Sequence, residues 1–80
     1  MKLPRDLSGA DLMKALGRVG YSVTRQKSSH IRLSTDRNGS HHVTVPDHEA
    51  IKVGTLADIL KDVAAHLGLD RDVLLKELFG

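Results

Sequence analysis

The chain has 80 residues, no cysteine and a formal net charge of +2, with an isoelectric point near 9.2. This length is expected to give one domain, residues 1–80, whose core is near the lower size limit for independent folding. The lack of cysteine excludes a disulfide framework and a thiolate metal site. No stretch approaches membrane-spanning length and the first residues lack the apolar segment of a secretory signal, so we expect a cytoplasmic protein without membrane contact.

Tyr21 and Phe79 are the only aromatic residues, and both occupy positions expected to be buried. Proteins that read single-stranded nucleic acid by sequence usually stack bases on exposed aromatic side chains. Fixed positive charges are concentrated between Lys14 and Lys52, whereas the C-terminal third is acidic to neutral. Any RNA binding is therefore expected to use phosphates, 2′-hydroxyls and shape, with weak sequence preference, and direct DNA binding is not expected.

The first predicted element is a helix over residues 9–19. Ser8 is a suitable N-cap, and Asp11 completes an imperfect capping box three residues later. Leu12, Leu16 and Val19 share one helical face, and Gly20 stands where a left-handed residue is wanted after the helix.

Three strands are expected next, over residues 21–26, 30–35 and the apolar stretch around residues 43–45. Residues 27–29 are predicted to form the first turn, and residues 37–39 a three-residue loop with Gly39 left-handed. This loop pairs Leu33 with Val43 and Ile31 with Val45, which keeps the apolar side chains on one face.

Two helices complete the predicted order. Thr55 with Asp58 predicts the N-terminus of a helix that ends at Gly68, and Asp70 is expected to cap a short third helix. The order α-β-β-β-α-α indicates an α+β sandwich with a three-stranded antiparallel sheet.

The second strand carries the most suggestive chemistry. Its alternation turns Ile31 and Leu33 inward, so His30 and Arg32 face solvent. An imidazole that titrates near neutral pH beside fixed positive charges suits proton transfer on an anionic substrate, although a lone exposed histidine is more often a plain surface residue.

Several ordered blocks resemble the HicA-type toxins, the YcfA-like mRNA interferases of type II toxin–antitoxin systems, over about residues 7–69. The blocks are Gly9-Ala10-Asp11-Leu12-Met13-Lys14-Ala15-Leu16 with Gly20-Tyr21, Arg25-Gln26-Lys27-Ser28-Ser29-His30, Val43-Thr44-Val45-Pro46-Asp47-His48, and Lys52-Val53-Gly54-Thr55-Leu56 with Ile59-Leu60. The resemblance implies a double-stranded-RNA-binding-like fold, ribosome-independent cleavage of mRNA and a HicB-like antitoxin partner. It also implies that His30 is the catalytic histidine.

The chain departs from the family pattern at two positions. Ser28 stands where the family often has glycine, and Ile31 stands where it often has a second histidine. Ile31 fits the inward strand position. Ser28 is expected to alter the hairpin angle that aims His30, because serine tolerates a positive φ poorly.

The expected mechanism needs no cofactor, because RNA carries its own nucleophile in the 2′-hydroxyl. His30 is expected to act as general base or acid, and Lys27 and Arg32 to hold the phosphate, with Ser29 donating a further hydrogen bond. His48 is the candidate for a second proton-transfer group. Lys52 adds a possible phosphate contact at a helix N-terminus, where anions are favoured.

The remaining histidines are interpreted as structural or solvated. His41 and His42 are read as surface residues, and His66 as a residue that interacts with a helix C-terminal dipole. A metal site formed by His41, His42 and His48 is a minor alternative, because helical ligand spacing and a supporting acid pair are missing.

Two other function classes stay open. A non-catalytic RNA-binding module has the same element order, and it would not need His30. A protein-interaction domain without RNA function would show no salt-dependent affinity for RNA, whereas phosphate binding weakens steeply as salt rises.

Overall fold

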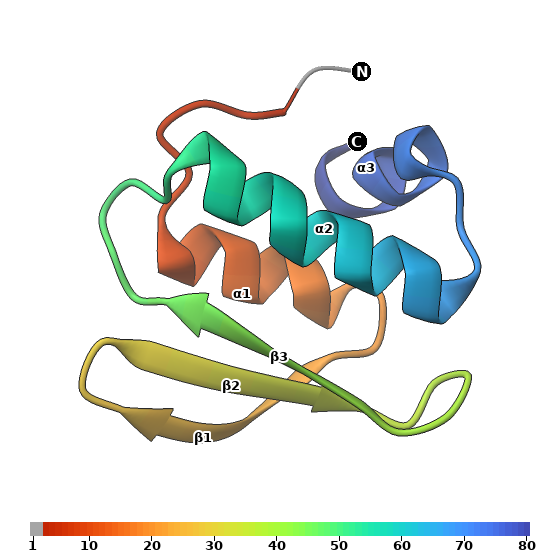
Figure 1. Ribbon diagram of the computed structural model, residues 1–80, viewed down its shortest axis with the longest axis horizontal. Coiled ribbons are helices and arrows are strands. Elements are labelled where there is room, and N and C mark those ends of the chain that lie inside the picture. The colour runs from red at the N-terminus through yellow and green to blue at the C-terminus, as the bar shows by residue number, and fades with distance from the viewer. Residues whose placement is uncertain (1–2) are drawn as a thin grey trace.

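Six elements follow one another in the order α-β-β-β-α-α in the computed structural model, which describes residues 3–80 (Figure 1). Met1 and Lys2, the first residues of the expected domain, lie outside the described residues. The elements are α1 (Gly9–Gly17), β1 (Ser22–Lys27), β2 (His30–Thr35), β3 (His41–Pro46), α2 (Val53–Leu67) and α3 (Arg71–Phe79). The predicted α+β class, with a three-stranded antiparallel sheet and an extra C-terminal helix, is confirmed.

The helices all lie on one side of the sheet, which leaves the other sheet face uncovered (Figure 1). α1 and α2 pack against the strands, and α3 packs against α1 and α2. Among the described residues, no helix is long and apolar enough to cross a membrane. The core lies between the sheet and the helices, and its fully buried side chains include Leu12, Leu16, Val19, Leu33, Val45, Leu56, Val63, Leu74, Leu75 and Leu78.

α1 begins as predicted and ends two residues earlier. Ser8 and Asp11 form the complete capping box, and these hydrogen bonds lower the pKa of Asp11. After the helix, Gly20 has φ of 102°, and the amide of Tyr21 donates to the carbonyl of Leu16 at 3.1 Å. This is the 6→1 bond of a Schellman ending, which explains why the apolar pattern runs on to Val19 while the helix stops at Gly17.

The turn between β1 and β2 has two residues, because Lys27 pairs with His30 and so belongs to β1. Ser28 has φ of 52°, and Ser29 does not have a positive φ. A positive φ at the first loop position alone is the pattern of a type II′ turn, which favours glycine there. Ser28 therefore occupies a strained position at the turn that leads into His30.

The predicted register between β2 and β3 is confirmed. Leu33 pairs with Val43 and Ile31 with Val45. The loop is longer than predicted, because pairing stops at Thr35 and His41 and leaves residues 36–40 unpaired. The hydroxyl of Thr35 accepts from the amide of Arg37 at 3.0 Å, which turns the chain away from the ladder. Gly39 has φ of 98°, as expected.

The predicted start of the second helix is wrong. α2 begins at Val53, with Lys52 as its N-cap, and Thr55 lies in its first turn. The earlier start is tolerated because Val53, Gly54 and Thr55 are exposed, so water can pair with their amides. α3 follows as predicted, with Asp70 accepting from the amide of Asp72. Phe79 at its end is only partly buried, unlike Tyr21, which is buried in the core as expected.

Replacing Ser28 with glycine is expected to stabilise the protein by about 1 kcal/mol, because glycine adopts a positive φ without steric cost. Ser29→Gly in the same turn is the matched control. It should not raise the free energy of unfolding, because residue 29 does not have a positive φ that glycine would favour. The free energy of unfolding in urea measures both. Equal effects of the two variants would contradict the strained turn.

Replacing Gly9 with alanine is expected to cost about 1–3 kcal/mol of stability, because an added Cβ would overlap the carbonyl oxygen of Pro46 and lie 2.9 Å from Cα of Asp47. Gly17, in the same helix, has no heavy atom within 4 Å of such a Cβ. Gly17→Ala should therefore stabilise by up to about 1 kcal/mol through helix propensity. A Gly9→Ala variant as stable as Gly17→Ala would contradict the tight contact between α1 and the chain after β3.

Candidate active site and nucleic-acid interface

The uncovered face of the sheet is positively charged. Strand pairing sets Lys27 opposite His30 and Arg25 opposite Arg32, so these four side chains point to the same face. All four are exposed, and their side chains make no hydrogen bond or ion pair within residues 3–80. None of the three strands contains an aspartate or a glutamate. The face therefore offers unpaired positive charge to an anionic ligand.

An irregularity in β1 brings Arg25 and Lys27 to this face. The pairing between β1 and β2 shifts between Val23 and Arg25, so that one extra residue, Thr24, is inserted. A β-bulge of this kind reverses the alternation of the residues that follow it. Without it, Arg25 and Lys27 would point to the same side as Ile31. The bulge is not predicted by the residue pattern of β1, and Arg25 was therefore not among the candidate residues.

A hollow of ≈ 340 Å³ opens where β2 begins and β3 ends. Its lining includes His30 from β2, His48 from the chain after β3, and Lys52 at the start of α2. Thr44, Pro46 and Thr55 complete the lining. Three of the side chains selected from the sequence, which are separated by up to 22 positions, thus meet around one space open to solvent.

The N-terminus of α2 adds to the positive potential of this hollow. Lys52 is the N-cap and makes no side-chain capping bond, and the first turn contains no acidic residue. The first amides of a helix have no partner within the helix, and its dipole is positive at this end. Because Lys52 and Thr55 line the hollow, this uncapped end adds its potential to that of Lys52.

Backbone hydrogen bonds position the segment that carries His48. The carbonyl of His48 accepts from the amide of Gly9 at 2.9 Å, where α1 begins. The amide of Asp47 donates to the carbonyl of Ser29 at 2.7 Å, which ties the β1–β2 turn to the same segment. Both sides of the hollow are therefore held by main-chain bonds. Gly9 has a structural role here that nothing in the sequence pattern signalled.

The other selected residues border the hollow without lining it. Lys27 is the strand partner of His30, and Arg32 is two residues further along the same face of β2. Ser29 lies in the turn directly before His30 and is exposed. The arrangement places His30 and His48 at one end of the basic sheet face, with Lys27 and Arg32 on the strands beside them.

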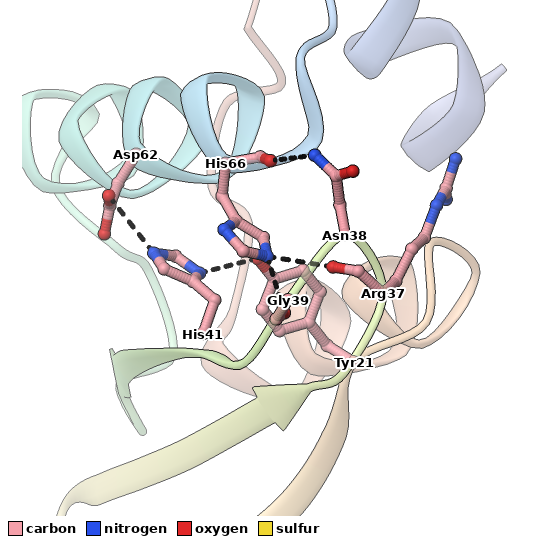
Figure 2. A network of polar contacts seen from close by, with 7 residues as sticks. All are labelled: Tyr21, Arg37, Asn38, Gly39, His41, Asp62 and His66. Carbon is pink, nitrogen blue, oxygen red and sulfur yellow. Dashed lines mark hydrogen bonds and ion pairs between the residues drawn. The ribbon is translucent and has the colours of Figure 1, made fainter.

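The interpretation of His41 as a surface residue is wrong, because its side chain lies on the inward face of β3, only 18% exposed. Figure 2 shows its ring between Asp62 of α2 and the phenol of Tyr21. Nδ1 lies 2.7 Å from the Tyr21 hydroxyl, and Nε2 lies 3.3 Å from Oδ1 of Asp62. Burial and the Asp62 carboxylate raise the pKa of Tyr21 to about 12, so the phenol stays protonated. His41 lies two residues before Val43 in the same strand, so the alternation of β3 could have placed it on the inward face.

His66 lies in the last turn of α2 as expected, but its ring interacts with the β2–β3 loop and not with the helix end. Nε2 lies 2.9 Å from the carbonyl of Arg37 and 3.0 Å from that of Gly39, so this nitrogen carries the proton and donates. Asn38 returns a bond to the carbonyl of His66, and the His66 ring stacks on His41 (Figure 2). The network fastens the loop to α2, so both histidines are structural.

The alternative metal site of His41, His42 and His48 is not formed, because His41 and His42 point to opposite sheet faces. Within residues 3–80, no group of three or more histidine, cysteine, aspartate or glutamate side chains is gathered for a metal ion. His42 is exposed, as expected for a surface residue.

Comparison with known proteins identifies the family of this chain. Neither the curated proteins nor the solved structures gave a match. The family model described as "HicA toxin of bacterial toxin-antitoxin" matches residues 9–64, well over half of the chain. This segment runs from the first residue of α1 into α2, and it includes the sheet, His30, His48 and Lys52. The chain belongs to the HicA toxin family of bacterial toxin–antitoxin systems.

Proposed function

We propose that this toxin is an endoribonuclease that cleaves mRNA without the ribosome, with His30 as its catalytic proton-transfer residue. The observation that carries the proposal is the hollow shared by His30, His48 and Lys52 at the end of a sheet face without carboxylates. The family supplies the context of a toxin with a cognate antitoxin. The chain would act as one domain on the RNA.

The substrate phosphate is proposed to sit in the hollow, against Lys52 and the uncapped start of α2. Helix N-termini bind phosphate through free amides and the positive end of the dipole. Lys27 and Arg32 would hold the neighbouring phosphates, and the fork of the Arg32 guanidinium suits bidentate contact. Ser29, beside His30, would donate a hydrogen bond to a phosphoryl oxygen. These contacts are sequence-independent, in keeping with the absence of exposed aromatic platforms.

The proposed chemistry uses the 2′-hydroxyl of the substrate as the nucleophile. The 2′-oxygen attacks the adjacent phosphorus in line, the bond from phosphorus to the 5′-oxygen breaks, and a 2′,3′-cyclic phosphate and a 5′-hydroxyl result. One group must take the proton of the 2′-hydroxyl, and another must give a proton to the leaving oxygen. His30 would perform one of these transfers, a role that contributes about 10²–10⁴-fold to the rate.

His48 is the proposed partner for the other proton transfer. It lines the same hollow as His30 but reaches it from the segment after β3. This segment is held by the amide of Gly9, so His48 need not rely on a flexible loop for its position. A phosphate between the two imidazoles would have one on each side, as an acid and a base require.

The antitoxin is proposed to inhibit the toxin by covering the same face. Lys27, Arg32 and Arg25 have no acidic partner within residues 3–80, so carboxylates of an antitoxin would find them unpaired. Complementary charge of this kind speeds association and sets specificity. The HicB-like partner would then compete directly with RNA for Lys27 and Arg32.

His30→Ala is expected to reduce RNA cleavage by at least about 10²-fold, because no other histidine occupies its position. The free energy of unfolding should change by no more than about 0.5 kcal/mol, since the side chain is exposed and unbonded. RNA affinity should largely survive through Lys27 and Arg32, and growth inhibition should be lost. Cleavage of labelled RNA, urea unfolding, RNA binding and a growth assay measure the four quantities.

If the His30→Ala variant cleaved RNA as fast as the wild type, His30 would not be catalytic, and His48 would become the first candidate for the proton-transfer residue. If instead neither the wild type nor the variant cleaved RNA, and the variant kept both RNA binding and the cellular effect, the alternative of a non-catalytic RNA-binding module of double-stranded-RNA-binding-like fold would be favoured. Lys76→Ala on α3 is a charge control, because its side chain is far from the sheet face and should alter neither binding nor cleavage.

Cleavage is expected to continue in the presence of a strong chelator, because the proposed steps use only side chains and the 2′-hydroxyl. The products should carry a 2′,3′-cyclic phosphate and a 5′-hydroxyl, which mass spectrometry of the fragments identifies. Products with a 5′-phosphate, or loss of all cleavage on chelation, would contradict this mechanism.

A further inference from the structure

A chain of hydrogen-bonded side chains crosses the uncovered sheet face at the end opposite His30. Nδ1 of His42 lies 2.6 Å from the hydroxyl of Ser34, and that hydroxyl lies 2.9 Å from the hydroxyl of Thr24. The three residues come from β3, β2 and β1, so the chain spans the whole width of the sheet. The bulge in β1 is what presents both Thr24 and Arg25 opposite Arg32.

These bonds fix the orientation of an exposed imidazole. Nδ1 of His42 is engaged by Ser34, so Nε2 is the atom that the ring presents to a ligand. Nε2 has no hydrogen-bond partner within residues 3–80. Holding an exposed side chain in one place costs conformational entropy, which a plain surface histidine does not pay. A histidine oriented in this way is suited to bind a ligand on the sheet face.

A second hollow lies beside the hydrogen-bonded side chains of Thr24 and Ser34. It has a volume of ≈ 410 Å³, and its lining includes Ser22, Thr24 and Ser34. Thr35 also lines it, but this residue is buried and its hydroxyl already accepts from the amide of Arg37. Asp36 and Arg37 place one charge of each sign at its border. Hydroxyls that can both donate and accept, with nearly balanced charge, suit the sugar and phosphate oxygens of a nucleotide better than they suit a free phosphate anion.

The two ends of the sheet face are too far apart to contact one phosphate. Ser34 is four residues after His30 on the same face of β2, a distance of roughly 13 Å at about 3.3 Å per residue. The two ends would therefore contact different nucleotides of the same RNA strand. Arg32 and Arg25 lie between the two ends, where they would face the intervening phosphates.

We propose that Ser34, His42 and Thr24 form a second subsite, which binds the sugar–phosphate backbone of the substrate RNA at a nucleotide beyond those flanking the cut. The proposal rests on the endoribonuclease function above and extends it. His42 and Ser34 are positioning residues in this scheme and not catalytic ones. They would fix the path of the strand across the sheet and make affinity depend on RNA length.

The test compares a dinucleotide with a strand of about eight nucleotides, both 2′-O-methylated so that they cannot be cleaved. Wild-type protein should bind the longer strand more tightly, and His42→Ala should weaken this binding about two- to tenfold, the worth of one or two hydrogen bonds. Binding of the dinucleotide should not change. Ser34→Ala should have the same effect, and the double variant should lose little more, because the two residues act as one unit.

Ser40→Ala is the matched control, since its hydroxyl lies in the β2–β3 loop outside the hydrogen-bonded chain. Equal loss for both RNA lengths, additive losses in the double variant, or an effect confined to antitoxin binding would overturn the subsite. Cleavage of unmodified RNA is measured in parallel. Active cleavage with no effect of His42→Ala on long RNA refutes the subsite alone, whereas length-dependent binding without cleavage refutes the endoribonuclease function alone.

Discussion

The pairing register of β2 is the constraint on which the rest of the structure depends. It sends Ile31 and Leu33 into the core and leaves His30 and Arg32 on the uncovered face. A slip of one residue would turn the apolar residues of one strand to solvent, at about 1.5–3 kcal/mol for each buried side chain. The loss for two such side chains is comparable with the lower end of the stability of a small domain, about 5–15 kcal/mol. The core therefore fixes the direction of His30, although His30 contributes nothing to the core.

Part of the positive charge on the sheet face depends on the β-bulge in β1. The bulge at Thr24 turns Arg25 and Lys27 toward the face of His30, the face on which Thr24 bonds Ser34. The uncapped start of α2 adds the positive end of a helix dipole at one corner of this face. The polar network of Tyr21, His41, Asp62 and His66 holds the opposite corner by fastening the β2–β3 loop to α2. The face is thus fixed at both ends by contacts that lie outside it.

The spacing of apolar residues predicted most of the fold, because the same alternation decides which side chains are buried and which residues of neighbouring strands pair. The Leu33–Val43 register, the Ser8 cap and the left-handed residues Gly20 and Gly39 all follow from local rules and are confirmed. The bulge was not predictable, since nothing in Thr24 or Arg25 distinguishes a bulged strand from a regular one. His41 was misread because its partners come from distant segments, although its parity with Val43 placed it inward. The meeting of His30, His48 and Lys52 needed the fold itself, because α1 and the β1–β2 turn set the path of the chain between them.

The central claim is that RNA binds across the uncovered sheet face, with its phosphate at the start of α2. NMR of the protein titrated with uncleavable RNA tests this most directly, because each histidine ring reports on a different place. The account predicts large shifts for the rings of His30 and His48 and for the amides at the start of α2. The rings of His41 and His66, behind the sheet, should keep their positions. Shifts confined to α3, or equal shifts in all five histidines, would contradict it.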